Sequence, residues 1–149
     1  MPDSNDQLTS DHGFDLSHDG ERLAPIIEQL HQWDVRCSLF MDADTAQIQH
    51  AQAIGADRIE LYTGPYADAF LLSEQATKQQ FVRYQTAAKH AQAIGLEVNA
   101  GHDLNLQNLP LLLSIGGIAE VSIGHALTVD ALLMGYEQAV KQYHRLCQA

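Results

Sequence analysis

The sequence predicts an α/β fold in which short parallel strands alternate with helices. Three apolar segments, residues 57–64, 95–102 and 120–125, end in Thr-Gly, Gly-His and Gly-His. The hexamer His50-Ala-Gln-Ala-Ile-Gly55 recurs letter for letter as His90-Ala-Gln-Ala-Ile-Gly95, with an apolar segment close behind each copy. The repeated object is a helix-to-strand unit, which is the module of parallel α/β folds. We therefore expect the functional site at the carboxyl ends of the strands.

Length and composition exclude several classes of protein. A chain of 149 residues, 46% apolar and 18% charged, is predicted to form a single domain over residues 1–149 with its own core. No apolar run approaches the roughly 20 residues of a membrane span, and the polar N-terminus lacks the features of a signal peptide. The net charge of −11 argues against nucleic acid or an anionic membrane as a partner. The two cysteines are expected to be free thiols, which suits the cytoplasm.

The first part of the chain is predicted to be a loop followed by a helix, a strand and a second helix. Residues 1–19 are polar and form a loop lead-in. Helical spacing runs over residues 20–33, which places Pro25 in the first turn. A strand follows over residues 35–41, and an acidic cap then opens a helix that ends near Gly55.

The remaining elements continue the alternation. In order they are a strand within 57–64, a turn over 63–68, one or two helices over 69–93, a strand at 98–100, a short helix over 104–115, a strand at 121–123 and a final helix over 126–146. The strands lack clean alternation, as expected when both faces of a sheet are buried. Four such strands fit either an open sheet or half of an eightfold barrel.

Four blocks of sequence resemble a known enzyme family. Residues 38–44, 55–68, 98–102 and 123–126 resemble pyridoxine 5′-phosphate synthase of the deoxyxylulose-dependent vitamin B6 pathway. The resemblance implies a (β/α)₈ TIM barrel that condenses 1-deoxy-D-xylulose 5-phosphate with 3-amino-2-oxopropyl phosphate, without metal or organic cofactor. It also implies phosphorylated small-molecule substrates and a homo-oligomer, the family octamer.

The same resemblance implies that this chain is shorter than its family. It corresponds to the C-terminal half of a barrel, with about four parallel strands, the fifth to the eighth. The family's remaining catalytic histidine and glutamate, and arginines for phosphate, belong to the N-terminal half. We therefore expect the chain to be incomplete and inactive alone.

The resemblance assigns roles to individual residues. His102 matches the proton-donating histidine, and Glu60 matches a glutamate that stabilises the transition state. Gly124 and His125 match the pair that holds the aminoketone phosphate, and Thr9 matches a threonine that contacts the deoxyxylulose phosphate.

The residue types suit these roles, although each has an ordinary structural alternative. Histidine has an unperturbed pKa of about 6.5 and can give or take a proton near neutral pH. Glu60 lies in an apolar strand, where an unpaired carboxylate is costly, so a buried ion pair with Arg58 or with a barrel lysine is the alternative. Gly124 before a helix suits phosphate binding, or is simply a tight turn. Asp103 lines the same site where the family has glycine, and it adds negative charge near a phosphate.

Other functions receive less support. The two histidines and three aspartates of residues 11–19 could bind a metal, but their spacing fits no tight motif, and no metal is expected. A catalytically dead half-barrel, acting as an oligomeric or phosphate-binding module, is the main alternative. No lysine lies at a strand end, which counts against a Schiff-base aldolase. Half of a closed barrel would leave unpaired strand edges, so self-association is expected.

Overall fold

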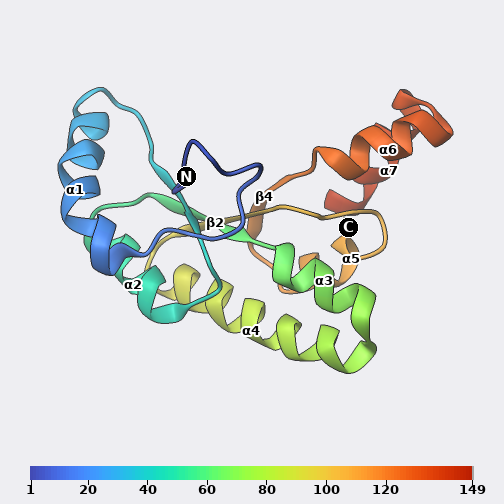
Figure 1. Ribbon diagram of the computed structural model, residues 1–149, viewed down its shortest axis with the longest axis horizontal. Coiled ribbons are helices and arrows are strands. Elements are labelled where there is room, and N and C mark those ends of the chain that lie inside the picture. The colour runs from blue at the N-terminus through green and yellow to red at the C-terminus, as the bar shows by residue number, and fades with distance from the viewer. Residues whose placement is uncertain (149) are drawn as a thin grey trace.

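The computed structural model describes residues 1–148, and its centre is a four-stranded parallel sheet (Figure 1). Its strands lie in chain order: β1 (Ser38–Met41), β2 (Arg58–Tyr62), β3 (Glu97–Gly101) and β4 (Ile118–Ser122). The helices are α1 (Leu16–Gln32), α2 (Thr45–Ala53), α3 (Gly64–Leu72), α4 (Glu74–Ala93), α5 (Leu109–Leu113), α6 (His125–Met134) and α7 (Tyr136–Cys147). Among residues 1–148, no helix combines the length and apolar character that crossing a membrane requires.

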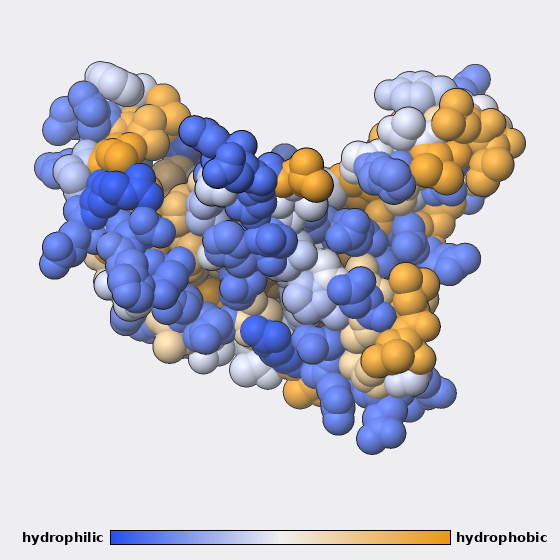
Figure 2. All heavy atoms as spheres, in the orientation of Figure 1, coloured by the Kyte–Doolittle hydropathy of each residue, from blue (hydrophilic) through white to orange (hydrophobic). Residues whose placement is uncertain are grey.

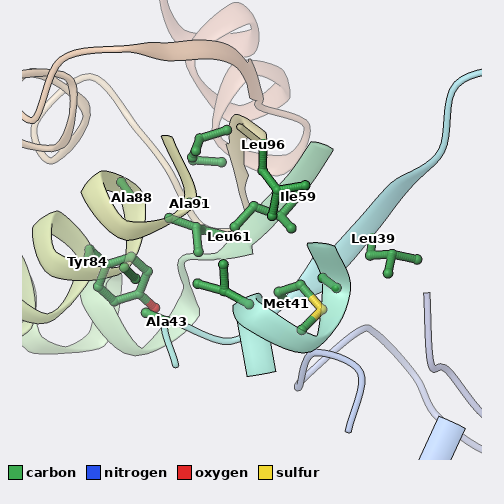
Figure 3. Packing of buried hydrophobic residues seen from close by; sticks show 14 of the residues in the cluster. Leu39, Met41, Ala43, Ile59, Leu61, Tyr84, Ala88, Ala91 and Leu96 are labelled. Atoms are coloured by element: carbon green, nitrogen blue, oxygen red, sulfur yellow. The ribbon is translucent and has the colours of Figure 1, made fainter. Parts of the chain in front are cut away.

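One face of the sheet carries the hydrophobic core. Leu39 and Met41 of β1 and Ile59 and Leu61 of β2 are buried there, and Tyr84, Ala88 and Ala91 of α4 pack against this face (Figure 3). Burial alternates regularly along β2. The expectation that both faces of the strands are buried therefore fails for β2, whose residues between the core positions are polar and only partly covered, whereas β1 and β3 bury residues of both faces, such as Phe40 and Asn99.

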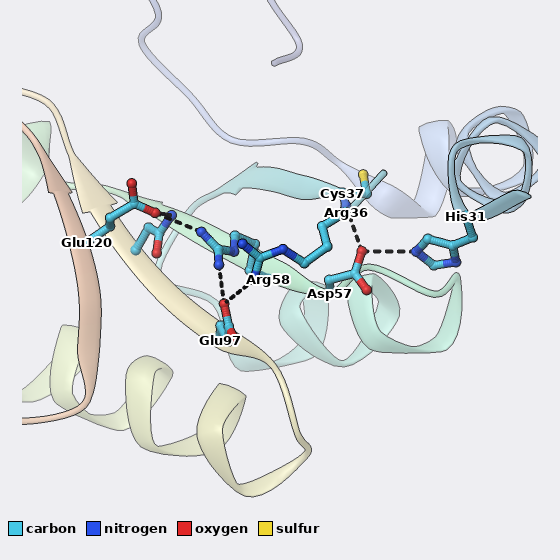
Figure 4. A network of polar contacts seen from close by, with 8 residues as sticks. His31, Arg36, Cys37, Asp57, Arg58, Glu97 and Glu120 are labelled. Carbon is cyan, nitrogen blue, oxygen red and sulfur yellow. Dashed lines mark hydrogen bonds and ion pairs between the residues drawn. The ribbon is translucent and has the colours of Figure 1, made fainter. Parts of the chain in front are cut away.

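The opposite face of the sheet carries a network of charged side chains (Figure 4). The Arg58 guanidinium donates to Glu97 and, at 2.7 Å, to Glu120, which also accepts from the Asn99 amide at 3.2 Å. Arg36 makes a longer contact of 3.4 Å with Glu97. Charged groups on this face thus pair with one another across β2, β3 and β4.

The first helix begins earlier than predicted. Asp15 is its N-cap and accepts a hydrogen bond of 3.0 Å from the Ser17 amide, so the loop lead-in covers residues 1–15 and not 1–19. Pro25 consequently lies inside α1, not in its first turn, and the helix lacks one internal hydrogen bond there. The prediction placed the helix by its apolar periodicity, which begins after Gly20, and the Asp15 cap precedes that periodicity.

The repeated hexamer ends two helices in the same way, as predicted. Gly55 and Gly95 have φ values of 92° and 88°, the left-handed region that glycine tolerates. The carbonyls of His50 and His90 accept equivalent bonds of 3.1 Å from the amides of the isoleucines four residues on. Strands β2 and β3 follow directly.

Three other boundaries differ from the prediction. The supposed turn at 63–68 is the start of α3, and Ser73 separates α3 from α4, so of the one or two helices predicted over 69–93 the structure has two. The final helix is interrupted at Gly135, whose φ of 89° is incompatible with a continuous helix. The short helix α5 covers only the apolar core of the predicted segment, because an ordered loop precedes it.

Candidate active site

A cavity of about 1040 Å³ opens at the carboxyl ends of the strands. All six residues singled out in the sequence line it: Thr9, Glu60, His102, Asp103, Gly124 and His125. They come from the N-terminal segment, from β2, and from the loops that follow β3 and β4. The structure thus brings together every predicted site residue.

The Glu60 carboxylate lies directly over Gly101, the residue before His102. A Cβ atom on Gly101 would stand 2.1 Å from Glu60 Oε1 and 3.1 Å from the Ser122 Cβ. Glycine at this position therefore lets the carboxylate extend from β2 across β3 toward β4. Within residues 1–148, Glu60 forms no hydrogen bond or ion pair. The alternative of a pair with Arg58 is wrong, because Arg58 binds Glu97 and Glu120.

The main chain at His102 has an uncommon conformation, which Thr63 stabilises. The φ of His102 is 88°, a value that few residues other than glycine adopt. The buried Thr63 hydroxyl donates to the carbonyl of Gly101 at 2.7 Å and to that of His102. The Thr63 amide also binds the Gly101 carbonyl, at 2.9 Å. The backbone that presents His102 is therefore held from the neighbouring strand.

Two aromatic rings flank the His102 imidazole. The ring centroids of Phe40 and Tyr62 lie 5.5 Å and 5.3 Å from that of His102, and Tyr62 meets it edge-on at 79°. A Cβ on Gly64 would stand 2.3 Å from the Tyr62 hydroxyl oxygen, so Gly64 leaves room for the phenol at the start of α3. Burial, and then the negative charge of Asp103, raises the pKa of Tyr62.

Two asparagines shape the loop after His102. The Asn108 amide donates to the Asp103 carbonyl at 3.0 Å, and its oxygen accepts from the Asn105 amide at 2.9 Å. Asn108 is buried, and the Tyr66 hydroxyl binds its carbonyl at 2.7 Å. Sequence reasoning missed both asparagines, although Asn-x-x-Asn before a proline is typical of side chains that stabilise a turn. The Asp103 residue itself is exposed, with φ 56°.

The N-terminus of α6 faces the same cavity. Gly124 is the N-cap of this helix, no side chain caps it, and a Cβ on Gly124 would meet nothing within 4 Å. The first backbone N–H groups of a helix lack internal partners and carry partial positive charge. A phosphate could approach these groups closely, beside the His125 side chain.

Thr9 reaches the cavity from the segment that crosses the sheet (Figure 1). This segment is tied to the strand end because the Phe14 amide donates to the Phe40 carbonyl at 2.9 Å. The Gly13 amide donates to Asp42 at 3.2 Å, and a Cβ on Gly13 would stand 2.2 Å from the Asp42 nitrogen. Glycine is therefore required where the segment passes the end of β1.

The family model "Pyridoxal phosphate biosynthesis protein PdxJ" matches residues 1–149. This chain belongs to the PdxJ family.

Proteins named pyridoxine 5′-phosphate synthase are among its relatives. The one from Albidiferax ferrireducens is 52% identical over 146 residues, covering 97% of this chain and 57% of the relative. Those from Xanthomonas campestris pv. campestris and Porphyromonas gingivalis are 48% and 45% identical over 144 residues, covering 96% of this chain and 56% and 59% of the relatives. The chain thus spans a little over half the length of these PdxJ relatives, and its assignment to the C-terminal half stays a prediction.

The charges around this PdxJ-family cavity are mostly negative. Glu60, Asp68 and Asp103 line it together with two histidines, and no lysine or arginine side chain does so among residues 1–148. In the same described range, no group of three or more His, Cys, Asp or Glu side chains is arranged to hold a metal ion. Within residues 11–19, His18 of α1 pairs with the N-cap Asp15 at 2.8 Å, and His12 in the preceding segment pairs with Asp11.

Proposed function

We propose that this chain forms part of a pyridoxine 5′-phosphate synthase. The reaction condenses 1-deoxy-D-xylulose 5-phosphate with 3-amino-2-oxopropyl phosphate and gives pyridoxine 5′-phosphate, phosphate and water. One observation carries the proposal. Glu60, His102 and the N-terminus of α6 line a single cavity at the strand ends of a PdxJ-family chain.

The residues have distinct roles in this proposal. His102 donates a proton during ring closure, for which an imidazole is suited near neutral pH. Glu60 stabilises the positive charge that develops on nitrogen, and its lack of an ion-pair partner leaves the carboxylate free to do so. The Gly124 amide, the first turn of α6 and His125 hold the aminoketone phosphate.

Two cavity residues contact substrate differently. The Thr9 hydroxyl donates a hydrogen bond to the phosphate of the deoxyxylulose substrate. Asp103 lies at the rim of the aminoketone site with its side chain toward solvent, which reduces its repulsion of the phosphate.

We further propose that the sheet is strands five to eight of a (β/α)₈ barrel in a single domain. A parallel sheet whose strands lie in chain order, with helices packed against one face, is expected of a barrel wall. The share of the relatives that the chain covers agrees with a part of such a barrel. Other strands would then cover the polar face, and the full protein would act as a cytoplasmic homo-oligomer.

The second candidate is a phosphate-binding module without catalytic activity of its own. The absence of lysine and arginine side chains from the cavity lining, among the described residues, favours it, because two phosphorylated substrates need compensating charge. Such a module would bind phosphate at the α6 N-terminus and convert nothing.

Product formation separates the two candidates. The chain is assayed for pyridoxine 5′-phosphate alone and with the segment of the Albidiferax ferrireducens relative that it does not match. The synthase proposal predicts product in the mixture, and a loss of about 10²–10⁴-fold in His102→Asn. His50→Asn, an exposed histidine of α2, is the matched control. Phosphate binding by calorimetry with no product at any ratio would instead support the binding module.

A further inference from the structure

We propose that Phe40 and Tyr62 are positioning residues that hold the His102 imidazole in its working orientation. The catalytic consequence rests on the proposed function, whereas the placement of the ring does not. The two residues form what we call the aromatic clamp.

The clamp comes from two adjacent strands. Phe40 is buried in β1, and Tyr62 is the last residue of β2. The centroids of the Phe40 and Tyr62 rings lie 5.5 Å apart, with an interplanar angle of 49°, so the two rings pack against each other as well as against the imidazole. Each ring also lies within contact range of His102, which closes a three-ring cluster.

Packing is what orients this imidazole. Among residues 1–148 its nitrogens make no hydrogen bond, in contrast to His31, whose Nε2 lies 2.9 Å from Asp57. The Thr63 hydrogen bonds fix the main chain of His102 and leave its side-chain rotamer free. The aromatic clamp restricts that rotamer and leaves both ring nitrogens available.

Tyr62 is itself held through its main chain, and its ring has room. The Tyr84 hydroxyl donates to the Tyr62 carbonyl, and Gly64 provides the space for the phenol. A general acid must lie about 2.6–3.2 Å from the atom that it protonates. A displacement of about 1 Å can cost about 10²-fold in rate, so the clamp affects catalysis without touching substrate.

Nuclear magnetic resonance tests the placement without any activity. In Tyr62→Leu, nuclear Overhauser effects between the His102 ring and the unaltered Phe40 are expected to weaken at least twofold, because one wall of the clamp is gone. Tyr62→Phe keeps the ring and is expected to preserve them. Tyr136→Leu, the same change at an exposed position of α7, controls for the substitution. His102–Phe40 effects of full strength in Tyr62→Leu would overturn the inference.

Kinetics tests the consequence in the chain complemented as described above. Tyr62→Leu is expected to lower kcat about 10–100-fold with KM within about twofold, and Tyr62→Phe to stay near the parent. An unchanged kcat in Tyr62→Leu would overturn the positioning role. If neither the parent nor any variant makes product, the proposed function fails. The nuclear magnetic resonance experiment then still tests whether the aromatic clamp holds the His102 ring.

Discussion

Glu60 is the residue whose environment says most about the site. Its carboxylate lies over Gly101 without a hydrogen bond or ion pair in the described chain, while other carboxylates on the same face are paired with Arg58. A paired carboxylate can be explained by the stability that its ion pair gives the fold. An unpaired carboxylate beside a cavity has no such explanation and therefore indicates a functional role.

Gly101→Ala is expected to displace Glu60 with little effect on the fold. The new Cβ would meet the tip of a flexible side chain, and the φ of Gly101 is not in the left-handed region. We expect product formation in the complemented chain to fall about 10-fold or more, with the free energy of unfolding within about 1 kcal/mol. Kinetics and denaturant unfolding measure the two effects. Full activity in Gly101→Ala would contradict the role given to Glu60.

At this scale the sequence pointed to residues with reactive side chains and gave no signal for those that we propose to position them. Blocks such as Asn-Ala-Gly-His pointed to His102 because its neighbours resemble a family. Phe40, Tyr62 and Asn108 carry no comparable signal, because aromatic and amide residues near strand ends are usually packing or turn residues. Their importance depends on which distant side chain they contact, and only the fold supplies that information.

The helices depend on caps that local sequence defines. Hydrogen bonds from Ser17 and then His18 lower the pKa of Asp15, the N-cap of α1, from 3.8 to about 2. A carboxyl whose folded pKa is depressed stabilises the folded state above its unfolded pKa and loses that effect as the pH falls toward the folded value.

Asp15→Ala should therefore lower Tm at neutral pH by an amount that stays constant down to about pH 4. The difference from the parent should shrink as the pH falls toward 2, because the parent cap becomes protonated. Asp15→Asn, which keeps an acceptor without the charge, is the matched control. Thermal unfolding across this pH range measures the difference. A gap of constant size down to pH 2 would exclude a charged cap.

Substitution by alanine should change the free energy of unfolding in opposite directions at two glycines, Gly135 and Gly20. Gly135, between α6 and α7, has φ 89°, so Gly135→Ala is expected to destabilise the chain by about 1 kcal/mol or more. Gly20 lies inside α1, and a Cβ there would meet only Ile54 at 3.9 Å, so Gly20→Ala is expected to stabilise by about 0.5–1 kcal/mol. Denaturant titration measures both changes, and equal signs would contradict this assignment.

The positions of β2, β3 and β4 along the chain were predictable because short apolar segments follow glycines that end helices. The break at Gly135 was not, since an isolated glycine within an amphipathic run is compatible with a continuous helix. The partly covered polar face of β2 was also missed. The strands are too short for their alternation to be distinguished from burial on both faces.

Over the whole molecule, apolar side chains gather on the surface of α3 and of the α6–α7 pair, at the right of Figure 2. Leu71 and Leu72 are 81% and 78% exposed, and Leu132 and Leu133 are 83% and 80% exposed. No residue of α6 is buried. Exposed apolar surface of this kind favours association.

The 149-residue chain is therefore expected to self-associate at micromolar concentration. Leu132→Lys with Leu133→Lys should reduce the mass measured by light scattering, and unfolding should change by no more than about 0.5 kcal/mol because both side chains are exposed. Lys141→Leu, which adds apolar surface to α7, is the opposite control. A parent chain that is already monomeric would contradict the expectation.

The acidic lining of the cavity has a consequence for ionic strength. Most phosphate sites rely on lysine or arginine, so salt weakens their binding by screening attraction. Here the acidic side chains that line the cavity are those of Glu60, Asp68 and Asp103, and their repulsion acts over about 10 Å at 0.1 M salt. Added sodium chloride should therefore strengthen the binding of inorganic phosphate to this chain, as calorimetry can measure. The trend should flatten in Glu60→Gln, and in the parent chain electrolytes would act as promoters of ligand capture.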